Sequence, residues 1–285
     1  MHDEAERRAA LAKWIVRKDH PLTWRSIVNR VWQWHFGEPI VGTPNDFGPL
    51  GQLPTHPELL DWLAVYFRDS GGSFKKLHKL LVMSETYRQT SIEDEVKEKL
   101  DSSNQWLWKM NRRKLSAEEM RDSVLMVSGK LNLEMGGAGF YLFNLEHTAH
   151  SPHYYYHKFD PEDEKSHRRS IYRFVVRSQP NPFMTTLDCA DSSQSTPKRN
   201  ETLTALQALS LLNNKFTLVM ARHFADRLAG EEDKITGQIE LGFELVAGRP
   251  PSVEEQNLLV EYASEHGMAN LCRSLFSLSE FAFID

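Results

Sequence analysis

Residues 22–36 read LTWRSIVNRVWQWHF, and this stretch sets the pattern for most of the chain. Its large apolar side chains, among them Trp24, Val28 and Val31, recur three or four positions apart, which is the spacing of one face of an α-helix. Gly37 follows directly, and glycine is common at the C-terminal end of a helix. The stretch therefore predicts an amphipathic helix that ends at a glycine.

The same periodicity appears on both sides of this stretch and predicts helices through the first 135 residues and again after residue 200. Ser116 with Glu119, and Ser252 with Glu255, have the spacing of capping boxes at helix N-termini. We expect a mainly α fold: a multi-helix globular domain with a small irregular or β insert. A single domain over 1–285 is expected, with helical parts at 1–135 and 201–285 and the insert at 136–200.

The insert is rich in Gly, His, Tyr, Ser and Pro, and only one of its segments has a regular pattern. Residues 172–177 alternate between apolar and basic side chains, which predicts a half-buried strand. A strand needs a partner, and the aromatic stretch HYYYHKF at 153–159 is the candidate.

Composition bounds the possible functions. The chain has 285 residues, of which 40% are hydrophobic, and a formal charge of −5, so a globular core is expected and a basic nucleic-acid-binding surface is not. No apolar stretch is long enough for a transmembrane helix, and the charged N-terminus does not resemble a signal peptide. Cys189 and Cys272 form neither CxxC nor CxxCH, which excludes a zinc ribbon and covalent haem attachment. We expect core thiols, with a disulfide left open as the alternative.

Several blocks, in order along nearly the whole chain, resemble the planctomycete domain of unknown function 1553. They are DHPLTWRSIVNRVWQWHFGEPIVGTPNDFG, THPELLDWLAVYF, LLVMSETYRQT, RRKLSAEEMRDSVLMVSGKL, RRSIYRFVVR, TTLDCADSS, RNETLTALQALSLLNNKF and SLFSLSEFAFID. The family has no assigned reaction, so the resemblance implies no chemistry.

The resemblance does imply a setting. Members of this family are typically the C-terminal part of long exported proteins, after another domain of unknown function and often a c-type cytochrome domain. The expected function is therefore that of an accessory or interaction domain of a cell-envelope protein, with an upstream cytochrome-bearing module as its partner. An extracytoplasmic location is expected on the same ground.

Four histidines fall within eleven residues of the insert: His147, His150, His153 and His157. Imidazoles at such spacings could meet at a zinc or copper ion, so a metal-binding or redox-associated domain is one hypothesis. The spacing matches no established ligand motif, and the alternative is a polar aromatic loop. No other cofactor is evident.

The insert also contains charged residues that could form an active site. These candidates are Arg173, Arg177, Asp188, Asp191 and Arg199. On a strand, Arg173 and Arg177 would share a face and could bind an anionic group, while the two aspartates could act as an acid–base pair. The alternative function is thus an enzyme acting on an anionic saccharide or similar substrate. The competing interpretation is an ion-pair network that pins the insert to the helices.

Overall fold

The computed structural model describes residues 3–148 and 151–284. Thirteen α-helices and two small two-stranded sheets make up the regular structure of these residues, so the mainly α fold class is confirmed. The chain divides into two compact units, of which the first ends at Arg113 and the second runs from Lys114 to Ile284. The expected single domain over 1–285 remains a prediction.

Unit 1 contains α1 (Glu4–Ile15), α2 (Thr23–Phe36), α3 (Pro57–Asp69), α4 (Phe74–Val82) and α5 (Glu95–Leu100). The helix predicted at 22–36 is α2, which ends at Gly37 with a φ of 82° that glycine adopts without a steric cost. The apolar faces of α2, α3 and α4 form the core of the unit, which includes Val28, Val31, Phe36, Leu60, Leu63, Phe67, Leu77 and Leu81.

One buried polar side chain holds the loop that follows α2. The Asn29 amide nitrogen donates to the Val41 carbonyl oxygen at 3.0 Å, and its amide oxygen accepts from the Val41 N–H at 2.8 Å. Both halves of the side chain are therefore satisfied, which offsets the cost of burying it completely.

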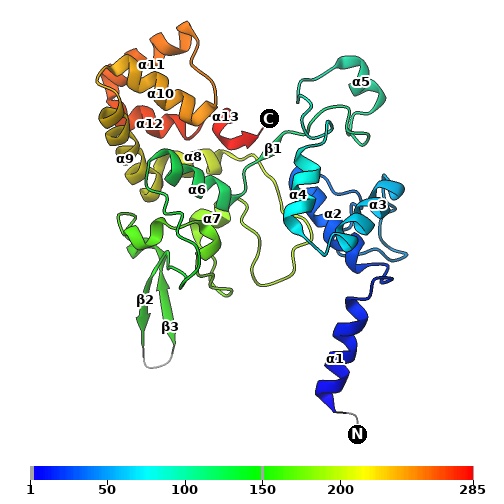
Figure 1. The fold of residues 1–285 in the computed structure, drawn as a ribbon. Helices are drawn as coiled ribbons and strands as arrows, with labels where there is room; N and C mark the ends of the chain where they lie inside the picture. Colours follow the sequence, from blue (N-terminus) through cyan, green and yellow to red (C-terminus); the bar gives the residue numbers. More distant parts are fainter. Residues whose placement is uncertain (1–2, 149–150, 285) are drawn as a thin grey trace. The chain divides into compact units, whose positions relative to one another are not determined.

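The first helix differs from the others in unit 1 because none of its residues is buried. Figure 1 shows α1 extending away from α2, α3 and α4. Its C-terminal end is held by two hydrogen bonds: Thr23 Oγ1 donates to the Ile15 carbonyl at 2.8 Å, and Trp24 Nε1 donates to the Arg17 carbonyl at 3.0 Å. The direction in which α1 leaves the unit is thus set by α2.

Unit 2 is built from α6 (Ala117–Val127), α7 (Pro182–Thr186), α8 (Ala205–Asn213), α9 (Lys215–Glu231), α10 (Ile235–Ala247), α11 (Val253–His266), α12 (Met268–Leu275) and α13 (Ser279–Ala282). Its core is formed by Val124, Leu125, Met184, Met220, Phe224, Leu228, Ile239, Phe243, Leu271, Cys272 and Phe276, among others. The short strands β1 (Arg113–Lys114) and β4 (Phe283–Ile284) pair with each other.

Both predicted capping boxes are confirmed. Ser116 and Glu119 satisfy each other's backbone N–H at the start of α6, and Ser252 and Glu255 do the same at the start of α11. The longest helix is α9, at 17 residues. In the described part of the chain, no helix has both the length and the apolar character that crossing a bilayer requires.

The insert folds around a hairpin and three short 3₁₀ turns. Strand β2 (Asn144–His147) pairs antiparallel with β3 (Pro152–Tyr155), with Glu146 opposite His153. The hairpin projects from the rest of unit 2 (Figure 1). The turns are η1 (Tyr156–Lys158), η2 (Glu164–His167) and η3 (Ser170–Tyr172).

The prediction of a strand at 172–177 is wrong. Tyr172 ends η3, and the segment after it makes a single bridge, in which Phe140 N donates to the Tyr172 carbonyl at 3.1 Å and Phe174 N donates to the Phe140 carbonyl at 2.8 Å. The chain beside it turns away into β2, so no ladder can extend. The aromatic stretch at 153–159 does supply a strand, but its partner is β2.

Candidate functional site

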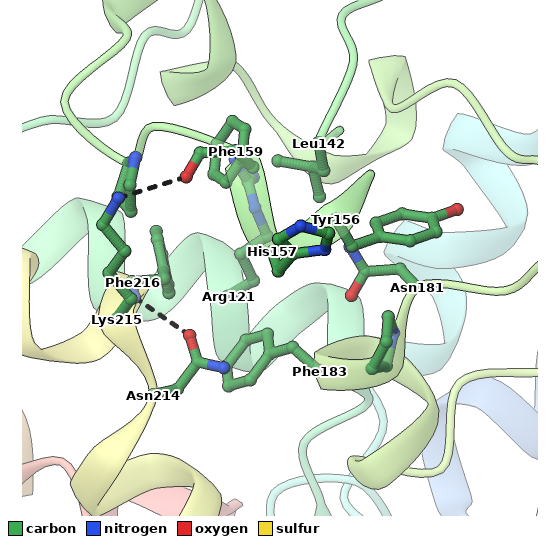
Figure 2. A pocket seen from close by; sticks show the side chains of 12 residues that line it. Arg121, Leu142, Tyr156, His157, Phe159, Asn181, Phe183, Asn214, Lys215 and Phe216 are labelled. Atoms are coloured by element: carbon green, nitrogen blue, oxygen red, sulfur yellow. Dashed lines mark hydrogen bonds between the residues drawn. The ribbon is translucent and has the colours of Figure 1, made fainter. Parts of the chain in front are cut away.

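Unit 2 contains a cavity of about 280 Å³ that is lined by the insert, including the N-terminal end of α7, and by the N-terminal end of α9. Figure 2 shows the side chains that line it. Its apolar walls are four aromatic rings and three aliphatic side chains: Tyr156, Phe159, Phe183, Phe216, Leu142, Pro161 and Pro182. The rings of Phe183 and Phe216 lie 5.8 Å apart at 57°, which is within the range of favourable aromatic contacts.

Five polar or basic side chains also line the cavity: Arg121, His157, Asn181, Asn214 and Lys215. No lining residue is acidic. The wall is therefore mostly apolar, with nitrogen-bearing groups at a few positions. This combination is typical of sites for small molecules.

Arg121 is a buried charge on α6, only 1% exposed. Its Nη1 donates to the Arg168 carbonyl at 3.1 Å and to Ser170 Oγ at 3.2 Å, and its Nη2 donates to the Ser166 carbonyl. Three points of the segment that contains η2 and η3 are thus tied to one side chain. Arg121 holds the insert in place beside the cavity.

A carboxylate and two aromatic rings surround the positive charge of Arg121. The Asp122 carboxylate lies 3.3 Å from Nη1, and the guanidinium stands over the rings of Phe140 and Phe216, 5.1 and 5.5 Å from their centres. Burial lowers the pKa of Arg121 to about 10, although the charge of Asp122 opposes that shift. The side chain remains protonated at neutral pH, and both of its terminal nitrogens already donate hydrogen bonds within unit 2.

The two asparagines of the cavity share one arrangement. Asn181 Oδ1 accepts from the Met184 N–H at 3.1 Å as the N-cap of α7, and Asn214 Oδ1 accepts from the Phe216 N–H at 2.9 Å as the N-cap of α9. Capping requires the oxygen, so the NH₂ end of each amide is left over. Neither NH₂ group has a hydrogen-bond partner in the described part of the chain, and Asn181 is only 9% exposed.

Lys215 and Tyr156 complete the rim. The Lys215 ammonium makes one long hydrogen bond, 3.4 Å to the Phe159 carbonyl (Figure 2), and lies near no carboxylate of the described residues. The Tyr156 hydroxyl donates to the Gln179 carbonyl at 2.6 Å, and burial raises the pKa of this phenol. The phenol is therefore neutral at physiological pH, and the rim presents a positive charge.

None of the five residues predicted as catalytic candidates lines this cavity. Two of them meet at Glu118 on α6. Arg199 Nη1 lies 2.6 Å from Glu118 Oε2, and Arg173 Nη2 lies 3.8 Å from Oε1. Burial by itself would raise the pKa of Glu118, but the hydrogen bond and charge of Arg199 outweigh it and the pKa is lowered.

Asp188 belongs to a second cluster. Its carboxylate accepts from Lys114 Nζ at 3.0 Å, from the Thr202 N–H at 2.8 Å and from Gln207 Nε2 at 2.9 Å. Burial opposes ionisation, yet these hydrogen bonds hold the pKa of Asp188 below its usual range. Asp188 also has a φ of 64°, in the left-handed region that few residues other than glycine adopt.

The remaining two candidates have local partners. Arg177 donates to the carbonyls of Ser192 and Ser193 at 3.1 and 3.0 Å, and Asp191 Oδ1 accepts from the Ser193 N–H at 2.8 Å. Since residues 172–177 form no strand, Arg173 and Arg177 do not form the expected fork: one contacts Glu118, and the other contacts backbone carbonyls. The catalytic role of the five candidates remains a prediction.

The histidines of the insert are spread over the hairpin and the cavity. His147 and His153 are exposed on β2 and β3, and His157 lies in η1 at the cavity wall. His150 lies outside the described residues. Among the described residues, no three His, Cys, Asp or Glu side chains come together as a metal site, and the metal hypothesis remains a prediction.

Sequence reasoning missed the cavity, although a signal for part of it was present. Asn181 precedes a proline, which is an N-cap signature, and Asn214 is of a residue type that often caps helices. The two caps are recognisable one at a time. That they face one aromatic cavity depends on how α9 packs against α7 and the rest of the insert.

The described residues are mainly helical, and unit 2 holds a largely apolar cavity of about 280 Å³. Residues 7–263 match the family described as PSD1, protein of unknown function (DUF1553), and this match extends over most of the chain. The chain belongs to this family, as the sequence blocks predicted. Neither the curated proteins nor the solved structures contain a match to the chain.

Proposed function

We propose that the chain is an accessory interaction domain of a larger cell-envelope protein, and that α1 is the surface through which it docks on a neighbouring, cytochrome-bearing module. The observation that carries the proposal is that no residue of α1 is buried. Leu11, Trp14 and Ile15 are 56%, 51% and 40% exposed and lie within one helical turn of each other.

An exposed helix of this length has little stability of its own. Isolated helices shorter than about 12–15 residues are marginal in water, because nucleation costs more than a few hydrogen bonds return. α1 has 12 residues and no buried side chain. A covering surface would supply the missing burial, at about 25 cal/mol per Å² of apolar area removed from water.

The charged residues of the insert also support a non-catalytic role. Arg199 and Glu118 pair at 2.6 Å, and Asp188 is saturated by Lys114, Thr202 and Gln207. Groups that are occupied by one another are not available to a substrate. The arrangement agrees better with pinning the insert than with an open active site.

The proposal is tested by titrating a purified c-type cytochrome module from a protein of this family onto the chain, with binding followed by interferometry. Amide hydrogen exchange of residues 5–15 is measured in parallel. We expect fast exchange in the free chain and protection in the complex. Leu11→Glu/Ile15→Glu should abolish binding, whereas Lys13→Glu, which changes the net charge of the same helix equally, should not.

Two results would contradict the proposal. One is binding that the Leu11→Glu/Ile15→Glu variant retains in full, since the apolar face of α1 would then not be the contact. The other is the absence of any binding by the cytochrome module, which would remove the partner implied by the family.

A further inference from the structure

We propose that the cavity of unit 2 is a binding site for a small aromatic carboxylate, a planar ring that bears one anionic group. The inference concerns a different surface from α1 and does not depend on the docking function. It rests on the size of the cavity, the chemistry of its walls and the unused donors that face it.

Size restricts the ligand to one ring. At about 280 Å³, the cavity lies just below the range of about 300–1,000 Å³ that holds drug-sized molecules. Phe183, Phe216 and Phe159 offer ring faces and edges, which favour contact with another aromatic ring at centroid separations of about 4.5–7 Å.

Two asparagine amides among the lining residues favour a ligand that carries hydrogen-bond acceptors. Asn181 is 9% exposed and lines the cavity, its oxygen is used by the Met184 N–H, and its NH₂ group has no partner in the described residues. Asn214 at the start of α9 is half-buried, and its NH₂ group likewise has no partner among the described residues. Both NH₂ groups are therefore available to donate to an acceptor on a ligand.

A carboxylate is the acceptor that fits best. The Lys215 ammonium at the rim has only a 3.4 Å contact with the Phe159 carbonyl, and it stands at the N-terminus of the 17-residue helix α9, where the helix dipole favours an anion. No lining side chain carries a negative charge. One carboxylate could therefore pair with Lys215, and the two asparagine amides supply further donors at the cavity wall.

The apolar walls disfavour a sugar acid. Beyond its carboxylate, a uronic acid brings several hydroxyl groups, each of which needs a partner once it leaves water. Three aromatic rings, a leucine and two prolines of the wall offer none through their side chains. An aromatic ring has no such requirement.

The inference is tested by calorimetric titration of the full chain with benzoate, with benzamide as its neutral isostere and with glucuronate. Benzoate should bind with a 1:1 stoichiometry, and benzamide should bind about tenfold more weakly or worse because it cannot pair with Lys215. Glucuronate should not bind detectably.

Two variants locate the site. Lys215→Gln removes the charge, and Asn181→Asp keeps an oxygen to cap α7 while replacing the NH₂ donor with a negative charge. Each should weaken benzoate binding by about tenfold or more. Lys234→Gln and Asn144→Asp, which make the same changes at exposed positions outside the cavity, should leave it unchanged. Circular dichroism melting confirms that each variant is folded.

The inference is overturned if benzoate does not bind, if benzamide binds as well as benzoate, or if Lys215→Gln leaves the benzoate affinity intact. Binding of glucuronate in the absence of benzoate binding would also overturn it, because the ligand would then be a sugar acid. Should Asn181→Asp fail to fold, Lys215→Gln and the benzamide comparison still decide the question.

Discussion

The Nε2 atom of His35 on α2 lies 2.7 Å from the Nδ1 atom of His78 on α4, so the two half-buried rings share one hydrogen bond. Such a bond needs at least one neutral ring, because two imidazolium groups have only donors to offer. Burial lowers the pKa of His35, and the charges of His78 and Arg113 lower it further. The folded unit 1 therefore binds a proton at His35 less readily than the unfolded chain does.

Unit 1 should lose stability in mild acid. Above the ordinary histidine pKa of 6.5 neither state is protonated at His35, and this residue contributes no pH dependence to stability. Below pH 6.5 His35 gains a proton in the unfolded chain more readily than in the folded unit. The free energy of unfolding therefore decreases as the pH is lowered. Urea denaturation at pH 7.5 and 5.5 measures the effect by tryptophan fluorescence, since all seven tryptophans precede Lys114.

The variant His35→Gln should show a smaller loss of stability between these two pH values, and His266→Gln, which changes an exposed histidine of α11, should behave as the parent chain does. An unchanged pH dependence in His35→Gln would mean that another group is responsible.

Arg121→Met should destabilise unit 2 by about 3 kcal/mol, because removing a buried charged group leaves its partners unsatisfied. The carbonyls of Ser166 and Arg168 lose their donor, and the segment with η2 and η3 should exchange its amides faster. Denaturation followed by circular dichroism and peptide-resolved hydrogen exchange measure the two effects. Arg222→Met, at a side chain that is 62% exposed, is the control and should be close to neutral.

Glu118→Gln should destabilise unit 2 at neutral pH and cease to do so in acid. The pKa of Glu118 is lowered in the folded chain, since the hydrogen bond and charge of Arg199 outweigh burial. A carboxylate of this kind contributes stability above the unfolded pKa of 4.5, and the contribution is lost as the pH falls through the folded value. Thermal melting of both chains from pH 7 to pH 3 should therefore converge, and a constant difference would contradict the ion pair.

The two thiols should be free and slow to react. Burial raises the pKa of Cys272 to about 12, and burial with the nearby charge of Glu118 raises that of Cys189. Because the thiolate is the reactive form, a thiol reagent such as Ellman's should label the native chain slowly at pH 8 and find two thiols after denaturation without reductant. Fewer than two would indicate a disulfide. Glu118→Gln should accelerate labelling of Cys189.

Much of the local structure could be predicted from the residues alone. The spacing of apolar side chains at 22–36 identified α2, and the pairs Ser116–Glu119 and Ser252–Glu255 identified the starts of α6 and α11. These signals act within one or two turns of the chain, where each backbone group finds its partner nearby. The family membership was recognisable for a related reason, since its sequence blocks are contiguous.

The insert shows where such signals fail. The alternation at 172–177 is that of a strand, but a strand also needs a neighbour to pair with, and the chain beside it continues into β2 instead. The aromatic stretch at 153–159 was correctly expected to form a strand, and its partner was wrongly assigned. Pairing is a property of two segments, and one segment's pattern does not contain it.

The sequence by itself determined the helices outside the insert, the two capping boxes and the family of this protein, because those depend on residues a few positions apart. The tertiary structure decided the rest: Glu118 meets Arg199, Arg121 is buried under the insert, and the two capping asparagines face one aromatic cavity. These partners lie tens of residues apart. Their meeting depends on the packing of whole elements, which no local spacing encodes.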